Sequence, residues 1–300
     1  MNLPTVKQLR YFVALADEGH FGRAAAASYV SQSAFSTAIK ELETSLNIRL
    51  VDRTNRQVTI TAIGRQIAAQ ARLCLRDLEG LAELARGECE PLAGELRLGV
   101  IPTIAPFLLP KALPRLRRAY PRLRLLLTEG QTQGLHDRLL TGELDAVLLA
   151  LPFELRGTET LPLFKDRFLL ACRDGTRLVD PRRYRFNRLE AGSVLLLEDG
   201  HCLRDHALDA CKLRGTEQLN GFAASSLLTL VEMVDADLGI TYLPEMTQGS
   251  ALLRNTRVRL HPLNDGSYRT IALAWRKGSA RDEQFQLLSE FFRTQSGEAS

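Results

Sequence analysis

The residues best suited to chemistry lie together in residues 198–211, which read EDGHCLRDHALDAC. This segment holds Cys202 and Cys211, nine positions apart, with two histidines, one arginine and several acidic residues around them. Such a combination could form a disulfide, bind a metal ion or provide a reactive thiol. The two cysteines could equally be small residues buried in an ordinary helix, so the segment by itself leaves four alternatives open.

The cysteine usage of the whole chain narrows these alternatives. Five cysteines are an odd number and are spread widely over 300 residues, whereas secreted disulfide frameworks are denser and usually even in number. His201, Cys202, His206 and Cys211 offer four zinc ligands, but their spacing lacks the close cysteine pair of typical zinc sites. We therefore predict no metal and no cofactor.

The composition indicates an ordinary globular protein. Hydrophobic residues make up 45% and charged residues 25% of the chain, which is normal for soluble domains. No apolar run approaches the roughly 18 uncharged residues that span a bilayer, and the N-terminal residues MNLPTVKQLRYF lack the pattern of a signal peptide. We expect a cytoplasmic location and no interaction with membranes.

Residues 1–65, at the N-terminus, are mostly helical in pattern. They carry eight basic and five acidic side chains, a mild excess that suits contact with nucleic-acid phosphates. Apolar residues recur at helical spacing up to Gly19, a short alanine-rich helix begins at Phe21, and Ser31 is a good N-cap for the next helix. Two short helices joined by a tight turn are typical of a helix-turn-helix, which we place at about Phe21 to Lys40.

The second of these helices and the hairpin after it form the predicted DNA interface. We expect the helix to bury Ala34 and Phe35 and to expose small hydrogen-bonding side chains on its other face. Residues 49–61 then read as strand, tip and strand, a wing that could place arginines on the DNA backbone or in the minor groove. The competing interpretation is a plain helical bundle with a surface hairpin. The predicted DNA contacts are Gln32, Ser33, Ser36, Thr37, Lys40, Arg53 and Arg56.

A single long helix is predicted from Thr61 to Arg86. Its apolar residues step by three or four positions from Ile60 to Ala85, close to a heptad pattern. This pattern favours a dimerising helix, and a dimer would place two recognition helices about one turn of DNA apart. The alternative is a helix that packs on its own domain.

The remainder of the chain, after a linker at 87–94, alternates strands and helices. This alternation predicts parallel sheets, and two similar series predict two α/β subdomains with a sensing site in the cleft between them. The expected strands are 95–101, 122–129, 145–151, 166–173, 194–199, 239–244 and 270–276. The expected helices are 106–119, 133–141, 203–213, 225–236 and 281–293. We divide the chain into a DNA-binding domain (1–62), a dimerisation helix (63–90), subdomain I (91–164 and 269–300) and subdomain II (165–268).

The order of these parts resembles that of the LysR-type transcriptional regulators over the whole chain. The stretch FGRAAAASYVSQSAFSTAIKELE is similar to that family's DNA-binding signature, and LVDRTNRQVTITAIG to its wing. Ser33 stands where many relatives carry proline, and Thr37 where many carry a basic residue. The stretches GVIPTIAPFLLP and LLLEDGHCLRDHALDAC are similar to those of the family's hydrogen-peroxide sensors.

The resemblance implies a multidomain fold. It comprises an N-terminal winged helix-turn-helix, a long linker helix and a C-terminal α/β regulatory module of two subdomains, similar to periplasmic binding proteins. It also implies the partners: a double-stranded DNA operator, hydrogen peroxide, further copies of the chain in a dimer or tetramer, RNA polymerase and a cellular thiol reductant.

The resemblance also gives the cysteine segment a role. Cys202 would be oxidised by hydrogen peroxide and would then form a disulfide with Cys211, changing the DNA contacts so that antioxidant genes are activated. Asp199 could cap a helix in which Cys202 lies in the first turn, where a thiolate is favoured. The peroxide-binding or thiolate-activating residues would be Thr103, Thr132, His201 and Arg204.

The spacing of the two cysteines makes that reaction a conformational event. If 202–211 were helical, the two Cα atoms would lie roughly 13 Å apart at about 1.5 Å per residue. A disulfide needs a Cα separation of about 4.4–6.8 Å. Bond formation would therefore rebuild the segment.

Two other functions remain to be weighed. A LysR-type regulator that responds to a small organic inducer in the cleft would need no cysteine pair. A thiol peroxidase would need no DNA-binding region, so residues 1–65 argue against an enzyme.

Overall fold

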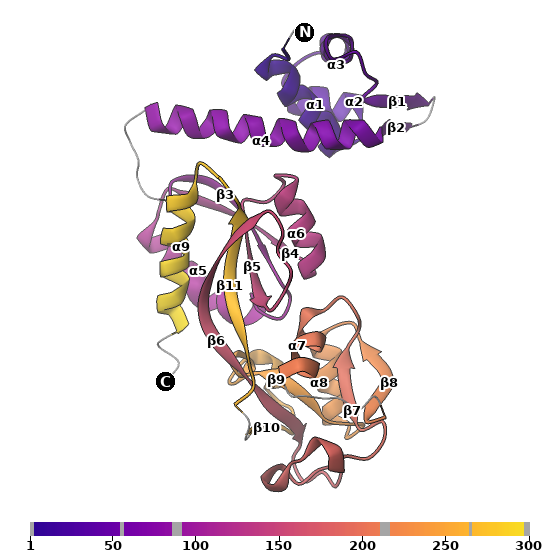
Figure 1. Ribbon diagram of the computed structural model, residues 1–300, viewed down its shortest axis with the longest axis vertical. Helices are drawn as coiled ribbons and strands as arrows, with labels where there is room; N and C mark the ends of the chain where they lie inside the picture. Colours follow the sequence, from indigo (N-terminus) through magenta and orange to yellow (C-terminus); the bar gives the residue numbers. More distant parts are fainter. Residues whose placement is uncertain (1–2, 55–56, 86–91, 211–216, 264–265, 297–300) are drawn as a thin grey trace. The chain divides into compact units, whose positions relative to one another are not determined.

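The computed structural model describes residues 3–54, 57–85, 92–210, 217–263 and 266–296 (Figure 1). The chain forms two compact units, which are described separately below. One unit comprises Met1–Glu90 with Asp137–Asp145 and Gly278–Arg281, and the other comprises the remaining residues. Within the described ranges, no helix is both long enough and apolar enough to cross a membrane.

The N-terminal unit is a winged helix-turn-helix followed by one long helix. Local capping signals set its helix ends: Gly19 ends the first helix in the left-handed conformation with φ 60°, and the Ser31 hydroxyl accepts a hydrogen bond from the backbone N–H of Ala34. Both predicted caps are confirmed. The elements are α1 (Val6–Glu18), α2 (Phe21–Ala27), α3 (Gln32–Leu46), β1 (Val51–Thr54), β2 (Gln57–Ile60) and α4 (Ala62–Ala85).

Helix α3 packs through a stripe of large apolar residues. Phe35, Ile39 and Leu42 are completely buried, and the ring of Phe35 stacks on that of Tyr11 in α1 with 5.0 Å between ring centroids. Ala34 was expected to be buried but is exposed. It lies in the first turn, to one side of the stripe that Phe35, Ile39 and Leu42 form.

Helix α4 is a single helix of 24 residues, as predicted. Three apolar residues of its expected seam are exposed in the monomer: Ile63, Leu78 and Leu81, at 43%, 42% and 65% of their full surface. The use of this helix as a dimer interface stays a prediction.

The second unit is organised by one mixed sheet of seven strands in the order β10-β6-β11-β5-β3-β4, with β9 also paired to β6. Parallel pairing holds only between β3 and its neighbours β4 and β5 in this sheet. The strands are β3 (Gly94–Val100), β4 (Leu123–Glu129), β5 (Ala146–Leu151), β6 (Thr158–Arg173), β9 (Thr241–Pro244), β10 (Val258–Pro262) and β11 (Tyr268–Arg276).

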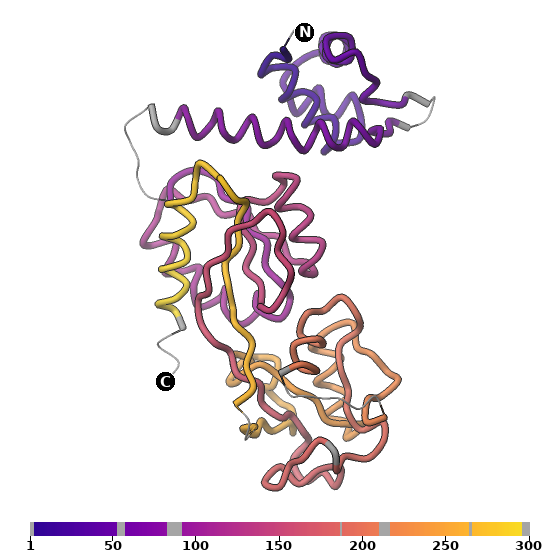
Figure 2. The backbone as a smooth tube through the Cα atoms, in the orientation of Figure 1, coloured from indigo at the N-terminus to yellow at the C-terminus, as the bar shows by residue number. Residues whose placement is uncertain are grey.

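The expectation of parallel sheets was therefore wrong for the strands that join the two subdomains. Strand β6 is 16 residues long and begins at Thr158 rather than 166. Its first part pairs with β11 and its second part with β9 and β10, all antiparallel. The reason is that β6 carries the chain into the second subdomain and β11 brings it back, a path that Figure 2 traces.

The remaining elements cover this sheet or extend it in the second subdomain. Helix α9 packs on β6, β11 and α5, whereas β7 pairs in parallel with β8. Strands β8 and β10 were not expected from the sequence. The helices are α5 (Ala105–Ala119), α6 (Thr132–Leu140), α7 (Cys202–Ala210), α8 (Leu227–Asp235) and α9 (Asp282–Ser296), with β7 (Val194–Leu197) and β8 (Leu219–Ala224). Short 3₁₀ turns are η1 (Pro181–Arg183), η2 (Phe186–Arg188), η3 (Glu245–Thr247) and η4 (Ala251–Leu253).

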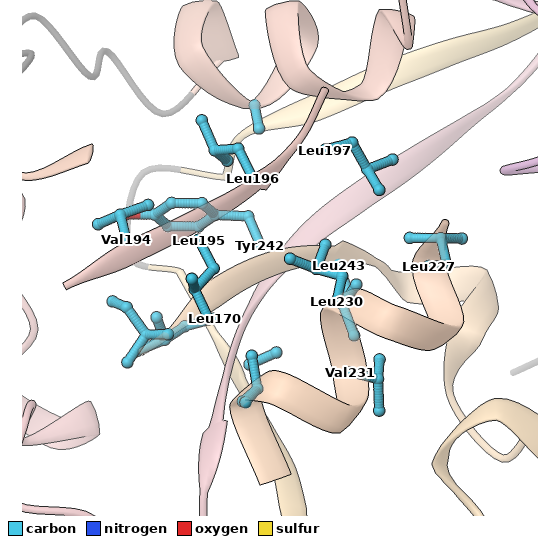
Figure 3. Close-up of a cluster of buried hydrophobic side chains, with 14 of the residues drawn as sticks. Leu170, Val194, Leu195, Leu196, Leu197, Leu227, Leu230, Val231, Tyr242 and Leu243 are labelled. Atoms are coloured by element: carbon cyan, nitrogen blue, oxygen red, sulfur yellow. The ribbon is translucent and has the colours of Figure 1, made fainter. Parts of the chain in front are cut away.

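The core of the second subdomain fixes the strand that leads to the cysteine segment. All four residues of β7 are buried, and Figure 3 shows their side chains packed against those of α8, β6 and β9. Such a strand, covered on both faces, is held by packing on every side chain. The turn between β7 and α7 therefore starts from a fixed point. The labelled members of this core are Leu170, Val194, Leu195, Leu196, Leu197, Leu227, Leu230, Val231, Tyr242 and Leu243.

Candidate functional site

Cys202 is the first residue of α7 and lies directly after the turn that leaves β7. Its thiol is free, and the residue is 8% exposed. Gly200 in this turn has φ 94°, and a Cβ at that position would lie 2.9 Å from Oε1 of Gln131. The backbone conformation strains any side chain at Gly200, and the Gln131 amide would have to move aside to admit one, so glycine suits the turn that precedes Cys202.

Two buried threonines from the other subdomain lie at the site, each in a strand-to-helix turn. Thr132 begins α6 after β4, and its hydroxyl lies beside the Cys202 thiol closely enough to lower the pKa of that thiol. The Thr132 Oγ1 atom is fully buried and has no hydrogen bond of normal geometry to any described atom. Thr103 follows β3 and is 2% exposed.

Arg269, at the start of β11, links Thr103 to the cysteine site. Its Nη1 donates to Oγ1 of Thr103 at 2.8 Å and its Nη2 to the Thr103 carbonyl at 2.9 Å. Its Nε donates to Oδ2 of Asp166 at 3.0 Å. Arg269 and Asp166 are directly opposite each other in the β11–β6 ladder, and they are only 1% and 3% exposed. A buried guanidinium held by a carboxylate and by two acceptors of one residue has a fixed position.

Sequence reasoning missed both Arg269 and Asp166. Asp166 stands at the boundary of an expected strand and Arg269 one residue before another. The residues are 103 positions apart, and only their strand pairing brings them together. The available signal was a charged residue at the start of an apolar strand. Such a residue suggests a buried ion pair, but the sequence does not show which residue is its partner.

Cys202 is surrounded by groups with opposing effects on its pKa. Burial is the largest effect and raises the pKa of the thiol above the ordinary 9.0, and the nearby carboxylate of Asp205 adds to it. The nearby hydroxyl of Thr132, the positive charge of Arg269 and the backbone N–H of Cys202 lower it. Burial therefore acts against the thiolate expected at the helix start, and the role of Cys202 as a thiolate stays a prediction. Loss of hydration is larger than the effect of any one of the groups that lower this pKa.

The other two residues expected to activate the thiol are Arg204 and His201, and their contacts are with residues just before Cys202 in the chain. Arg204 pairs through Nε with Oδ1 of Asp199 at 3.0 Å and donates from Nη1 to the Leu197 carbonyl at 3.2 Å. It therefore ties the turn to α7, and the Asp199 carboxylate that was expected to cap the helix is 94% exposed and engaged with it. His201 is buried, and its Nε2 lies 3.9 Å from a carboxylate oxygen of Glu198. Cys211 lies outside the described residues.

The face of α3 that we expect to contact DNA is largely exposed. Gln32, Ser33, Thr37 and Lys40 are exposed and Ser36 is half-buried. The Thr37 hydroxyl donates to the Ser33 carbonyl of its own helix at 3.0 Å, so it is oriented along the helix in the absence of DNA. In the wing, the backbone of Arg53 pairs with Val58. Arg56 and the side chain of Arg53 lie outside the described part of the chain.

One further residue of this region was not expected from the sequence. The Oε1 atom of Glu43 in α3 accepts from the backbone N–H groups of Leu50 and Val51, at 2.8 and 3.1 Å. Glu43 thus fixes the first wing strand on the recognition helix.

No group of three or more histidine, cysteine, aspartate or glutamate side chains that could hold a metal ion occurs among the described residues. Cys211, one of the four zinc ligands considered from the sequence, is not among them. The site that the described residues do form is a buried thiol with one hydroxyl and one guanidinium close to it.

A winged helix-turn-helix, a long helix and an α/β module of two subdomains are the parts of a one-component bacterial transcriptional regulator. Residues 6–65 match the family described as bacterial regulatory helix-turn-helix protein, lysR family, and residues 90–297 match the LysR substrate binding domain. The chain belongs to the LysR family of transcriptional regulators.

Two relatives and one solved structure are similar to the chain over nearly its whole length. It is 39% identical over 292 residues to the HTH-type transcriptional regulator EstR of Acinetobacter baylyi, covering 97% of both chains. It is 38% identical over 288 residues to the hydrogen peroxide-inducible genes activator of Dickeya chrysanthemi, covering 96% of this chain and 94% of the relative. The solved structure of a full-length OxyR variant from Pseudomonas aeruginosa matches with a TM-score of 0.84 and 35% identity, over 98% of this chain and 96% of that one.

Proposed function

We propose that the chain is a redox-responsive transcriptional regulator that senses hydrogen peroxide through oxidation of Cys202. The observation that carries this proposal is the buried Cys202 thiol beside the unpartnered hydroxyl of Thr132, with the guanidinium of Arg269 held close by Asp166 and Thr103. A buried polar group without a partner costs free energy unless a ligand uses it. Hydrogen peroxide is small and both donates and accepts hydrogen bonds, so it suits such a group.

The first chemical step is attack of the Cys202 sulfur on one peroxide oxygen. A sulfur–oxygen bond forms as the O–O bond breaks, and the second oxygen leaves with the thiol proton as water. Cys202 becomes a sulfenic acid. The charge of Arg269 favours negative charge on sulfur during this step, and the Thr132 hydroxyl orients the peroxide or the thiol.

The second step is attack of the Cys211 thiol on the oxidised sulfur, which forms the disulfide and releases a second water. The role of Cys211 rests on the resemblance to the peroxide sensors. Helix α7 runs from Cys202 to Ala210, and a helix of this length extends far beyond the separation of about 4.4–6.8 Å that a disulfide permits. Disulfide formation therefore requires α7 to unwind, and this change would alter the DNA contacts so that antioxidant genes are activated.

The partners follow from the same proposal. The exposed face of α3 and the wing bind a double-stranded operator, and α4 pairs two chains so that a dimer or tetramer spans the site. RNA polymerase receives the signal, and a cellular thiol reductant returns Cys202 and Cys211 to the reduced form. Thr103 and Thr132 remain the proposed peroxide-binding residues, with His201 and Arg204 in supporting positions.

A regulator that responds to a small organic inducer is the second candidate. It is favoured by the 39% identity to EstR, whose name carries no reference to peroxide. In that case the Cys202→Ser variant would keep its response to the inducer.

The test is DNA footprinting of the reduced and the peroxide-treated protein, together with peptide mapping of the treated protein by mass spectrometry. We expect the footprint to change on treatment and a Cys202–Cys211 crosslink to appear. Cys202→Ser should abolish both, and Cys172→Ser, which alters another buried thiol, should abolish neither. A footprint that never changes with oxidation, or a treated protein without the crosslink, would overturn the proposal.

A further inference from the structure

The segment after β5, Pro152–Arg156, is contacted by one histidine from each of two helices at the cysteine site. The Nε2 atom of His206 in α7 lies 2.8 Å from the carbonyl oxygen of Pro152. The Nε2 atom of His136 in α6 lies 3.0 Å from the carbonyl oxygen of Arg156, and its ring packs edge-on against Phe153 with 6.3 Å between centroids. The segment therefore connects α6 with α7.

The sequence spacing of these histidines matches on the two helices. His136 is four residues after Thr132, and His206 is four residues after Cys202. Residues four apart lie on the same face of a helix, one turn from each other. Each helix thus begins with a residue of the thiol site and, one turn later, is fixed to the same segment.

His206 is suited to hold a position rather than to exchange a proton. It is 3% exposed, and its Nδ1 atom is buried without a hydrogen-bond partner among the described residues. A carbonyl can only accept, so the Nε2 atom carries the proton. Burial lowers the pKa of His206, and the charge of Arg269 lowers it further, which keeps the ring neutral at pH 7.

We propose that His206 is a positioning residue for the oxidation of Cys202: its hydrogen bond to Pro152 holds α7 against the other subdomain and is released when α7 unwinds. This proposal rests on the peroxide-sensing function proposed above. It goes beyond that function because it names the contact that keeps the reduced form in place.

The effect of the His206–Pro152 hydrogen bond on the reduction potential depends on whether the reduced or the oxidised form contains it. The His206–Pro152 hydrogen bond exists only while α7 is folded, so it stabilises the dithiol relative to the disulfide. Stabilising the reduced form raises the reduction potential. Removal of the bond should therefore make the potential more negative and should also let α7 open more often in the reduced protein.

The experiment compares His206→Leu with His206→Gln in the full-length protein. Leucine keeps much of the volume without a donor, whereas the glutamine amide can donate to the same carbonyl. The first measurement is the equilibrium between the dithiol and the Cys202–Cys211 disulfide in glutathione buffers. We expect about a tenfold shift toward the disulfide for His206→Leu, which corresponds to about 30 mV, and little change for His206→Gln.

The second measurement does not depend on peroxide chemistry. It is the rate at which iodoacetamide labels Cys202 in the reduced protein, which reports opening of the buried site. We expect several-fold faster labelling in His206→Leu and a rate near that of the wild type in His206→Gln. If the wild type forms no disulfide, the peroxide-sensing proposal fails, while the labelling rates still decide whether His206 holds α7.

A matched control comes from the other histidine. His136→Leu should slow oxidation of Cys202 by peroxide, because Thr132 loses its support, but it should leave the dithiol–disulfide equilibrium unchanged because α6 is not rebuilt. If His206→Leu does not fold, His206→Asn, whose amide is too short to reach Pro152, takes its place. Equal behaviour of the leucine or asparagine variant and the glutamine variant would overturn the proposal.

Discussion

Two buried cysteines of the regulatory unit have very different surroundings. Cys172 lies in β6 and is 1% exposed, and Cys202 begins α7 and is 8% exposed. Burial is the main effect on both thiols. It raises the pKa of Cys172 to about 11, with Asp174 and Asp237 adding to the rise. Burial also raises the pKa of Cys202, but there the Thr132 hydroxyl and the Arg269 charge oppose it.

The difference shows that two buried thiols can have neighbours with different effects on the pKa, and the sensing role proposed for Cys202 depends on this difference. The sign of the neighbouring charges and the presence of a hydroxyl donor make the distinction. The negative charges of Asp174 and Asp237 raise the pKa of Cys172 and so disfavour its thiolate. Near Cys202 there is instead the positive charge of Arg269, which Asp166 and Thr103 hold in place. The following predictions test this distinction.

The largest effect is expected from removing the positive charge. Arg269→Met should slow the reaction of Cys202 with peroxide by about 100-fold, as for loss of a preorganised charge-stabilising donor. The rate is measured by quenching with an alkylating reagent and mass spectrometry. Because Asp166 would be left buried and unpaired, at a cost of about 3–5 kcal/mol, the double variant Asp166→Asn with Arg269→Met provides a folded control. A rate equal to that of the wild type in both would show that charge does not distinguish the two cysteines.

Removal of the hydroxyl should have a smaller effect. Thr132→Val keeps the shape of the side chain, and we expect a roughly tenfold slower oxidation, the equivalent of one hydrogen bond of about 1.4 kcal/mol. Thermal unfolding should be unchanged or occur at slightly higher temperature, because the buried hydroxyl has no other partner. A variant that is less stable but reacts as fast as the wild type would assign Thr132 a structural role only.

Lowering the pH should reduce the folding stability of the protein through protonation of His206. Burial is the main cause of its lowered pKa, and Arg269 adds to this while Asp205, Asp209 and the Pro152 carbonyl oppose it. The folded state therefore binds a proton less readily than the unfolded chain, whose histidine pKa is about 6.5. The stabilising contribution is complete above about pH 6.5 and is lost as the pH falls below that value.

The measurement is urea unfolding of the wild type and His206→Gln at pH 7.5 and 5.0. The wild type should lose more stability than the variant between these two conditions. An equal loss in both proteins would show that His206 does not titrate in this way.

The smallest effect is expected at Cys172. Asp174→Asn should lower the pKa of its thiol below about 11, but the value should stay above the ordinary 9.0 because burial is the larger cause. Thiolate absorbance during a pH titration in a Cys202→Ser background measures the change. A pKa at the ordinary value would mean that the aspartates, rather than burial, keep Cys172 unreactive.

The DNA-binding part could be predicted in detail because its signals are local. The caps at Gly19 and Ser31 and the buried stripe with Phe35 all depend on residues a few positions apart. The exception, Ala34, is a small residue for which periodicity gives a weak indication. Glu43 was missed because its partners are backbone groups seven and eight residues away.

The regulatory site could be predicted only in part. Thr103, Thr132 and Cys202 each stand at a strand-to-helix turn, a position that sequence reasoning can locate. Arg269 and Asp166 meet through antiparallel strand pairing, which the alternation of strands and helices did not indicate. The effect of burial on the pKa of Cys202 could not be predicted, because the helix start is visible in the sequence whereas the extent of burial is a property of the folded chain.

The β6–β11 ladder also limits how the two subdomains can move. The ladder extends from Thr158 opposite Arg276 to Arg167 opposite Tyr268, with one register shift between Ile271 and Ala272, and β6 then continues into pairing with β10. A wide hinge would have to break main-chain hydrogen bonds of this ladder, whereas a twist along the two strands would keep them. We therefore expect the regulatory module to resist opening more strongly than torsion. A signal that starts at α7 should be transmitted as local refolding and a small rotation rather than as closure of a cleft.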